Sequence, residues 1–291
     1  MPHNFSVKLI PNEGYALFRN RRSLRVGLVS AGARLPDELL GGHATNIFGL
    51  AAAVEEVTIE PPADTVVLKA TDFADCDSGD FYKYVPARTW QFMQRGSFQL
   101  GSPDYYRRTD NPGIGDWREG FSVIAFRHEN DQATFALRAG YNAAIFCGTR
   151  EVSGPDHARM MEQFSDDGGK CLRISVAEFM AHVKKRVRAF RVRYHDAIYT
   201  DAKCFAVENP IASEIREFLK GGLVVNELNR RWFQSLYDTA VLPSLFAKPR
   251  RHSHERERRI AFELRDNLQG PTLLVNDRAL LDFVEVVDTV K

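Results

Sequence analysis

Two carboxylates and a guanidinium recur at every second position near the C-terminal end of the chain, as Glu255, Glu257 and Arg259. The surrounding segment, HSHERERRIAFELRD, is typical of a β-strand, which sends alternate side chains to opposite faces. We therefore expect the three groups to line one face, with the carboxylates about 7 Å apart. The opposite, buried face is predicted to carry Ile260, Phe262 and Leu264.

A carboxylate held in such a row can stabilise positive charge that develops on a substrate, and it can deprotonate a nucleophile. The same pattern also occurs on solvated sheet edges, where alternating charges prevent aggregation. From the residues alone, a site and a solvated edge are both open interpretations.

The totals describe an ordinary globular protein. The chain has 291 residues, of which 44% are hydrophobic and 26% charged, and its net charge is +1. This charge provides no overall attraction to nucleic acid or membrane, so a polyanion would need a local patch. Basic clusters that offer such a patch occur around Arg19–Arg25, Lys184–Arg193 and Lys248–Arg259.

The cysteine pattern and the absence of long apolar runs indicate a cytoplasmic protein. The N-terminal segment lacks the apolar stretch of a signal peptide, and no run approaches the roughly 20 apolar residues of a membrane span. No CxxC pair and no zinc-ligand spacing occurs, so buried thiols in a reducing compartment are predicted. The cysteines are Cys76, Cys147, Cys171 and Cys204.

The elements that must position the charged row are predicted to fall into two parts. Residues 1–75 form an N-terminal extension or small α/β unit, with a helix suggested by the apolar spacing from Ile47 to Val57. The acidic segment TDFADCDSGD marks the boundary, and residues 76–291 form the main domain. A capping box at Ser175 and Glu178 is expected to begin a helix.

The main domain is predicted to interleave strands and helices irregularly. This order favours an α+β fold with mixed, largely antiparallel sheets and flanking helices over a doubly wound parallel sheet. No HExxH, GxSxG, dinucleotide-binding or phosphate-loop motif occurs, and no metal site is predicted. Strands are expected at 81–85, 98–100, 121–126, 134–139, 143–147, 171–174, 190–194, 273–275 and 283–287, and helices after Pro86, before Gly168, after Ser175 and around 211–219 and 226–240.

Six short motifs follow one another in a specific order over roughly residues 80 to 265: FYKY, LGSPDYY, REG, AIFCGT, MMEQFSDDGGKCLRI and FAKPRRHSHERERRI. This order resembles a widespread bacterial family known only as a domain of unknown function, with Tyr-Lys/His-Tyr and Glu-x-Glu-x-Arg motifs. The chain departs from that family where Tyr105-Tyr106-Arg107 replaces Phe-Asn-Asp. It departs again where Met160-Met161 and Phe164 replace a Trp and a Tyr.

The strand–helix–strand opening and the late glutamate-bearing strand are also distantly similar to the ADP-ribosyltransferase plan, which includes toxins that modify DNA or RNA. This resemblance implies an ADP-ribosyltransferase-like core that uses NAD as a substrate. It implies Glu257 as the first catalytic candidate and Glu255 as the second. Tyr82 or Tyr84 would stack on the cationic nicotinamide ring.

The remaining candidates carry weaker roles in the same resemblance. Arg259 would hold the pyrophosphate by bidentate contacts, or would simply pair with Glu257. Lys83 belongs to the same strand as the two tyrosines, but it shares a ligand face with them only across a bulge. Arg118 and Glu119 match a recurring acidic position of the bacterial family, and a loop ion pair is their alternative.

The sequence therefore leaves three functions open. The first is an NAD-consuming transferase that acts on nucleic acid or protein, such as a bacterial toxin or an antiphage defence component. The second is a non-catalytic nucleic-acid-binding or regulatory protein. The third is a nuclease with a divalent cation among carboxylates, which would be Asp104, Asp110, Asp116, Glu255 and Glu257.

Overall fold

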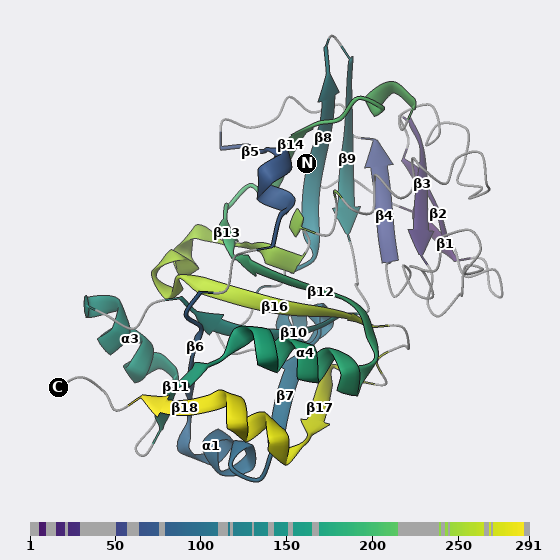
Figure 1. Ribbon diagram of the computed structural model, residues 1–291. Coiled ribbons are helices and arrows are strands. Elements are labelled where there is room, and N and C mark those ends of the chain that lie inside the picture. Colours follow the sequence, from purple (N-terminus) through teal and green to yellow (C-terminus); the bar gives the residue numbers. More distant parts are fainter. Residues whose placement is uncertain are drawn as a thin grey trace.

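The protein has an α+β fold with mostly antiparallel sheets, as its computed structural model shows (Figure 1). None of the helices in the described part of the chain is long and apolar enough to cross a membrane. The structure describes residues 6–9, 16–20, 23–29, 51–56, 64–75, 79–109, 116, 119–129, 131–138, 143–150, 154–164, 169–214, 239, 242–243, 245–264, 268 and 270–287.

The first sheet, sheet A, lies in the upper part of Figure 1. Its pairings are antiparallel except those of β14, which runs parallel to β8 and β5. A tight hairpin joins β8 to β9, with His128 opposite Asp131 and Glu129 in the left-handed region (φ 52°). The strand order is β1 (Ser6–Leu9), β2 (Ala16–Asn20), β3 (Ser23–Val29), β4 (Ala51–Glu56), β9 (Asp131–Arg138), β8 (Phe121–His128), β14 (Cys204–Glu208) and β5 (Val66–Leu68).

The second sheet, sheet B, is antiparallel throughout and contains the charged strand. Strand β7 (Ser97–Gly101) pairs with β10 and with β17 (Thr272–Asn276). A separate parallel pair consists of β13 (Ile198–Tyr199) and β15 (Ala247–Lys248). The main order of sheet B is β12 (Ala189–Asp196), β16 (Glu257–Leu264), β10 (Ala143–Thr149), β6 (Tyr82–Val85), β11 (Lys170–Ile174) and β18 (Val284–Val287).

Local sequence explains where the helices begin and end. Pro86 is the N-cap of α1, and Gly96 (φ 83°) ends the following turn in a conformation that favours glycine. The Ser102 hydroxyl accepts the Tyr105 N–H and so caps α2. The α-helices are α1 (Ala87–Met93), α2 (Pro103–Arg108), α3 (Gly154–Phe164) and α4 (Val176–Val187), and the 3-10 helices are η2 (Ala70–Phe73), η3 (Arg250–Glu255) and η4 (Arg278–Phe283).

One face of sheet B forms the main hydrophobic core. Helices α1, α4 and η4 cover this face, and the rings of Phe146 and Phe179 lie 5.0 Å apart at its centre. Burial of each such side chain stabilises the fold by roughly 1.5–3 kcal/mol. The predicted buried face of the charged strand is confirmed here, because Ile260, Phe262 and Leu264 all belong to this core.

Most predicted elements of the main domain are confirmed, but two local predictions are wrong. The apolar residues from Ile47 to Val57 do not form a helix throughout, because Ala51–Glu56 is strand β4 between β3 and β9. A run of small apolar residues fits both the helical and the strand period, so the pairing with neighbouring strands decides which structure forms. Ser175 does begin α4, but its side chain makes no capping hydrogen bond.

Other predictions lie on residues that the structure does not describe. These include the loop at 111–115, Gly168, Cys76 and most of the helices expected at 211–219 and 226–240. The division at residue 75 stays a prediction. Strands from both sides of that boundary hydrogen-bond within sheet A, where β4 pairs with β9 and β5 pairs with β14.

Candidate functional site

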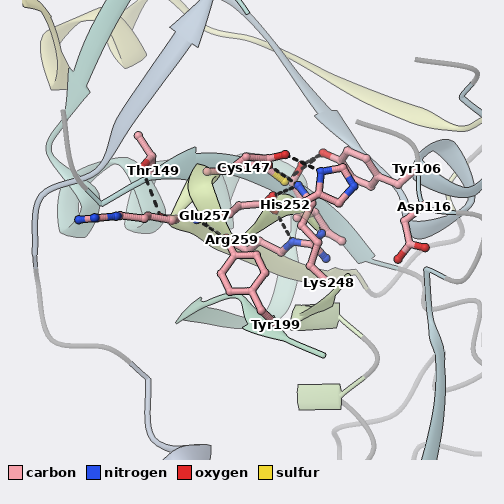
Figure 2. A network of polar contacts seen from close by, with 12 residues as sticks. Tyr106, Asp116, Cys147, Thr149, Tyr199, Lys248, His252, Glu257 and Arg259 are labelled. Carbon is pink, nitrogen blue, oxygen red and sulfur yellow. Dashed lines mark hydrogen bonds and ion pairs between the residues drawn. The ribbon is translucent and has the colours of Figure 1, made fainter. Parts of the chain in front are cut away.

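The two predicted catalytic carboxylates are buried and converge on one ammonium group (Figure 2). Glu257 is the first residue of β16, whereas Glu255 is the last residue of η3, so the prediction that both lie on one strand is wrong. Arg256 between them has a left-handed backbone (φ 42°), which turns the chain. Both carboxylates nevertheless bind the Lys248 Nζ, and their residues are only 4% and 5% exposed.

The solvated sheet edge is also ruled out by this arrangement. Strand β16 lies between β12 and β10, and Glu257 and Arg259 are buried on the face opposite the hydrophobic core. Charges in such a position must be paired, because an isolated buried ion is strongly unfavourable. The charged row is therefore an internal feature of the fold.

Arg259 is fully engaged with protein groups. Its Nε donates to Glu257 Oε1 at 2.5 Å, and its Nη1 donates to Glu119 Oε1 and to the Leu245 carbonyl, each at 2.6 Å. Nη2 lies 3.5 Å from Glu119 Oε2. Burial acts to lower the pKa of Arg259, but Glu119 and Glu257 raise it well above its ordinary value. Two roles are predicted for Arg259, which are pyrophosphate binding and pairing with Glu257. The structure shows the pairing with Glu257.

The hydrogen bonds around Glu255 fix the tautomer of a buried histidine. Arg251 Nε donates to His252 Nε2 at 3.0 Å, so Nε2 must be an acceptor. The proton therefore resides on Nδ1, which lies 2.7 Å from Glu255 Oε1. This neutral imidazole holds Glu255 in place beside Lys248. The backbone N–H of Glu257 is satisfied by the Tyr199 hydroxyl at 2.7 Å.

The cluster extends from sheet B to sheet A. Lys203, just before β14, donates from Nζ to Asp116 Oδ2 at 2.5 Å, and Glu119 lies just before β8. Burial lowers the pKa of Lys203, and Glu119 and Asp116 oppose this shift. We call the following residues the charged cluster: Asp116, Glu119, Lys203, Lys248, Glu255, Glu257 and Arg259.

The charges of this cluster keep Glu257 ionised. Burial alone would raise the pKa of Glu257, but Arg259 and Lys248 outweigh it and lower the pKa below its ordinary value. Burial likewise lowers the pKa of Lys248, and Glu257 and Glu255 reverse the shift and raise it. An anion held in this way can stabilise a neighbouring positive charge and accept hydrogen bonds. It is a poor general base near neutral pH, because its pKa is far from that range.

Strand β6, which carries Tyr82 and Tyr84, contributes side chains to the same face of sheet B as Glu257. Tyr82 lies opposite Thr149, and Thr149 lies opposite Glu257, so the three side chains share one face across β6, β10 and β16. Two strand spacings separate Tyr82 from Glu257, about 10 Å. Tyr82 is half-buried, and burial and the Asp80 carboxylate raise its pKa. Tyr84 points the same way, but it is buried against Met160 and Cys171.

Lys83 occupies the opposite face, as predicted. It pairs with Leu172 of the core, and its Nζ donates to the Cys147 carbonyl at 2.6 Å. The ammonium lies 4.5 Å from the centre of the Phe146 ring. Burial lowers the pKa of Lys83, although Cys147 and Glu257 act against this shift. Lys83 therefore cannot contact a ligand together with Tyr82.

Sequence reasoning missed Lys248, Lys203, Tyr199 and His252 as parts of this cluster. Lys248 was seen only as a member of a basic run, and no local motif marks it. Glu119 was a secondary candidate, and its partner is Arg259, 140 residues away in the chain, rather than its neighbour. Arg118 lies outside the described residues.

The carboxylates expected for a metal-dependent nuclease do not assemble. Asp116 binds Lys203, and Glu255 and Glu257 bind Lys248. Within the described part of the chain, no group of three or more His, Cys, Asp or Glu side chains is arranged to hold a metal ion. Asp110 and the side chain of Asp104 are not described.

A hollow of about 750 Å³ is lined by residues 79–80, 173–178 and 282–285, which include neither Tyr82 nor any residue of the charged cluster. Its charged lining includes Asp80 and Arg173, which are also the charged neighbours of the Tyr82 phenol. Arg173 bonds Asp80 at 3.3 Å and remains 55% exposed. The volume lies in the range of small-molecule sites. Glu178, Asp282 and Glu285 make the remaining wall acidic.

Comparisons with family models, curated proteins and solved structures found no match to this chain.

Proposed function

We propose that this chain is an ADP-ribosyltransferase-like effector that cleaves NAD and transfers ADP-ribose to a nucleic acid or a protein, as a bacterial toxin or an antiphage defence component. The observation that carries the proposal is the register that aligns Tyr82, Thr149 and Glu257 on one face of sheet B. The hollow supports it, because its wall includes Asp80 and Arg173, the charged neighbours of Tyr82, and its volume can hold a small molecule.

Glu257 has the electrostatic role in this proposal. Cleavage of the nicotinamide–ribose bond develops positive charge on the ribose, as in glycoside hydrolysis. A carboxylate that is already ionised and fixed stabilises this charge without reorganisation. Because the pKa of Glu257 is lowered, its role is charge stabilisation and hydrogen-bond acceptance rather than proton abstraction. Glu255 stays the second candidate.

The proposal requires Lys248 to release Glu257 when the substrate binds. Lys248 binds both carboxylates and thus occupies the place that a substrate cation would take. It lies in β15, which has only two residues and pairs with β13. Little backbone pairing therefore opposes a displacement of Lys248 by the cationic nicotinamide–ribose group.

The other groups of the site divide by their contacts. Tyr82 is the stacking candidate for the nicotinamide, because it is half-buried and lies near Asp80 and Arg173. Arg173 is the candidate for the pyrophosphate, because it is exposed and on the same wall. Arg259 is a positioning residue, since it orients Glu257 and binds Glu119.

The direct test is nicotinamide release from NAD by the purified chain, with oligonucleotides and cell lysate supplied as acceptors. We expect Glu257→Gln to reduce release by about 100-fold or more, a typical effect of losing one electrostatic group. Asp116→Asn is the matched control, because it also removes a buried, lysine-paired carboxylate of the cluster but leaves Glu257 and its partners intact. Absence of release by folded wild-type protein with every acceptor would refute the proposal.

A further inference from the structure

Helix α1 and the turn that follows it form an exposed stripe with two arginines and an aromatic ring. Arg88 and Phe92 lie in the helix at i and i+4, Arg95 lies in the turn, and all three are exposed. Phe92 is 48% exposed. Among the large hydrophobic side chains that are exposed in the described part of the chain, it is the aromatic one. An exposed ring between two guanidinium groups has no role in the hydrophobic core, which α1 contacts through the buried Met93 on its other side.

The stripe continues onto η4 through a close backbone contact. A Cβ on Gly96 would lie only 2.7 Å from the Cα and N atoms of Arg278, and the Asp277 N–H donates to the Gly96 carbonyl at 2.8 Å. This approach places Arg278, which is exposed, directly beside the end of α1 and therefore near Arg95.

An ion pair then joins η4 to the basic end of α4. Arg186 Nε bonds Asp277 Oδ2 at 2.9 Å, and His182 Nε2 lies 3.0 Å from the same oxygen. The Arg186 side chain is still 58% exposed. Lys185 precedes it on the exposed side of the helix. These contacts join three segments that carry exposed cations. We call these cations, together with Phe92, the basic ribbon: Arg88, Phe92, Arg95, Lys185, Arg186 and Arg278.

The basic ribbon contains five cations. Its cations contact Asp277, a carboxylate that is already bound by Arg186 and His182. Two further exposed carboxylates, Glu178 and Asp282, lie on α4 and η4. Among the residues that the structure describes, Arg88, Arg95, Lys185 and Arg278 form no ion pair. The ribbon also lies on the opposite side of sheet B from Glu257, because α1, α4 and η4 cover the hydrophobic face.

We propose that the basic ribbon binds single-stranded nucleic acid. Guanidinium groups bind phosphate oxygens by paired hydrogen bonds, and an exposed aromatic ring stacks on bases of any sequence. Arg88 and Phe92 are about 6 Å apart along the axis of α1, and Arg95 follows in the next turn, so one strand can stack a base and have its flanking phosphates bound. Four of the five cations are arginine, which is better suited than lysine to nucleic-acid recognition. A single exposed ring is a poor membrane anchor.

The test is fluorescence anisotropy with a labelled oligodeoxythymidine of about twenty nucleotides, titrated with the full chain at about 50 and 200 mM salt. We expect binding that weakens steeply with salt. The double variant Arg95→Gln/Arg278→Gln should weaken binding about tenfold or more and reduce the logarithmic salt slope by about 1.4, since each single-strand phosphate contact contributes about 0.7. Phe92→Ala should weaken binding by about fivefold or more at both salt concentrations.

The matched control is Arg150→Gln/Arg159→Gln, which removes two exposed arginines from the other side of sheet B. It should leave the affinity within about twofold. Equal losses in both double variants would overturn the proposal, because they would show attraction by net charge alone. Absence of oligonucleotide binding would also overturn it, whether or not the chain binds phosphatidylserine vesicles.

The basic ribbon does not rest on the proposed transferase activity. Glu257→Gln should bind the oligonucleotide as tightly as the wild type, because the charged cluster lies on the other face of the sheet. Conversely, the Arg95/Arg278 double variant should still release nicotinamide when a protein acceptor is supplied. A result that refutes one of the two proposals therefore leaves the other unaffected.

Discussion

Glu257 and Lys248 form a buried ion pair at the junction of the two sheets, and Lys248 binds Glu255 at the same time. Two carboxylates that share one ammonium would repel each other without it. On its other side Glu257 binds Arg259, which binds Glu119 near the start of β8. The pair is therefore the centre of a continuous charged connection from sheet B to sheet A.

Removal of Lys248 should strongly destabilise the protein. Lys248→Met leaves Glu255 and Glu257 buried with like charges and without their common partner, and loss of one member of a buried pair typically costs about 3–5 kcal/mol. Urea denaturation at neutral pH measures the change in the free energy of unfolding. Lys185→Met, at an exposed position on α4, should change it by less than about 0.5 kcal/mol. A similar small effect at both positions would contradict the importance of the pair.

The stability of the cluster should depend on pH in a direction set by Glu257. Its pKa is lowered in the folded protein, so its contribution is fully present above the unfolded value of about 4.3 and is lost as the pH falls toward the folded value. The difference in the free energy of unfolding between wild type and Glu257→Gln should therefore shrink below about pH 4. Urea midpoints measured from pH 7 to pH 3 follow it, and a constant difference would contradict this assignment.

Gly96 should be intolerant of a side chain. It has φ 83°, and an added Cβ would collide with the backbone of Arg278. Gly96→Ala should lower the free energy of unfolding by about 1–3 kcal/mol, and it should weaken oligonucleotide binding because it separates α1 from η4. Gly270→Ala is the control, since nothing lies within 4 Å of its added Cβ. Thermal unfolding and anisotropy measured on both variants distinguish the two positions.

Local sequence signals predicted the elements better than the site. Pro86 and Gly96 delimit α1, and alternating apolar residues mark β6 and β7, because these signals act over a few residues. The strand β4 was predicted as a helix, because its pairing with β3 and β9 is not visible in a run of alanines.

The site depended on contacts that no local pattern reveals. Glu255, Glu257 and Arg259 were identified, but their partners were not. Arg259 binds Glu119 across 140 residues, and Lys248 approaches both glutamates only because η3 folds back. The charged row was expected to face a ligand or solvent, whereas the structure buries it in ion pairs with Lys248 and Glu119.

Tyr82 should contribute to the proposed reaction through its ring and not through its hydroxyl. Tyr82→Phe keeps the aromatic face and should leave the KM for NAD within about threefold, whereas Tyr82→Ala removes the stacking surface and should raise the KM about tenfold. Tyr84→Phe is the matched control. Tyr84 lies two residues further along β6, and its phenol is buried against α3. The measurement is nicotinamide release at varied NAD concentration, with circular dichroism to verify folding. An unchanged KM in Tyr82→Ala would remove Tyr82 from the site.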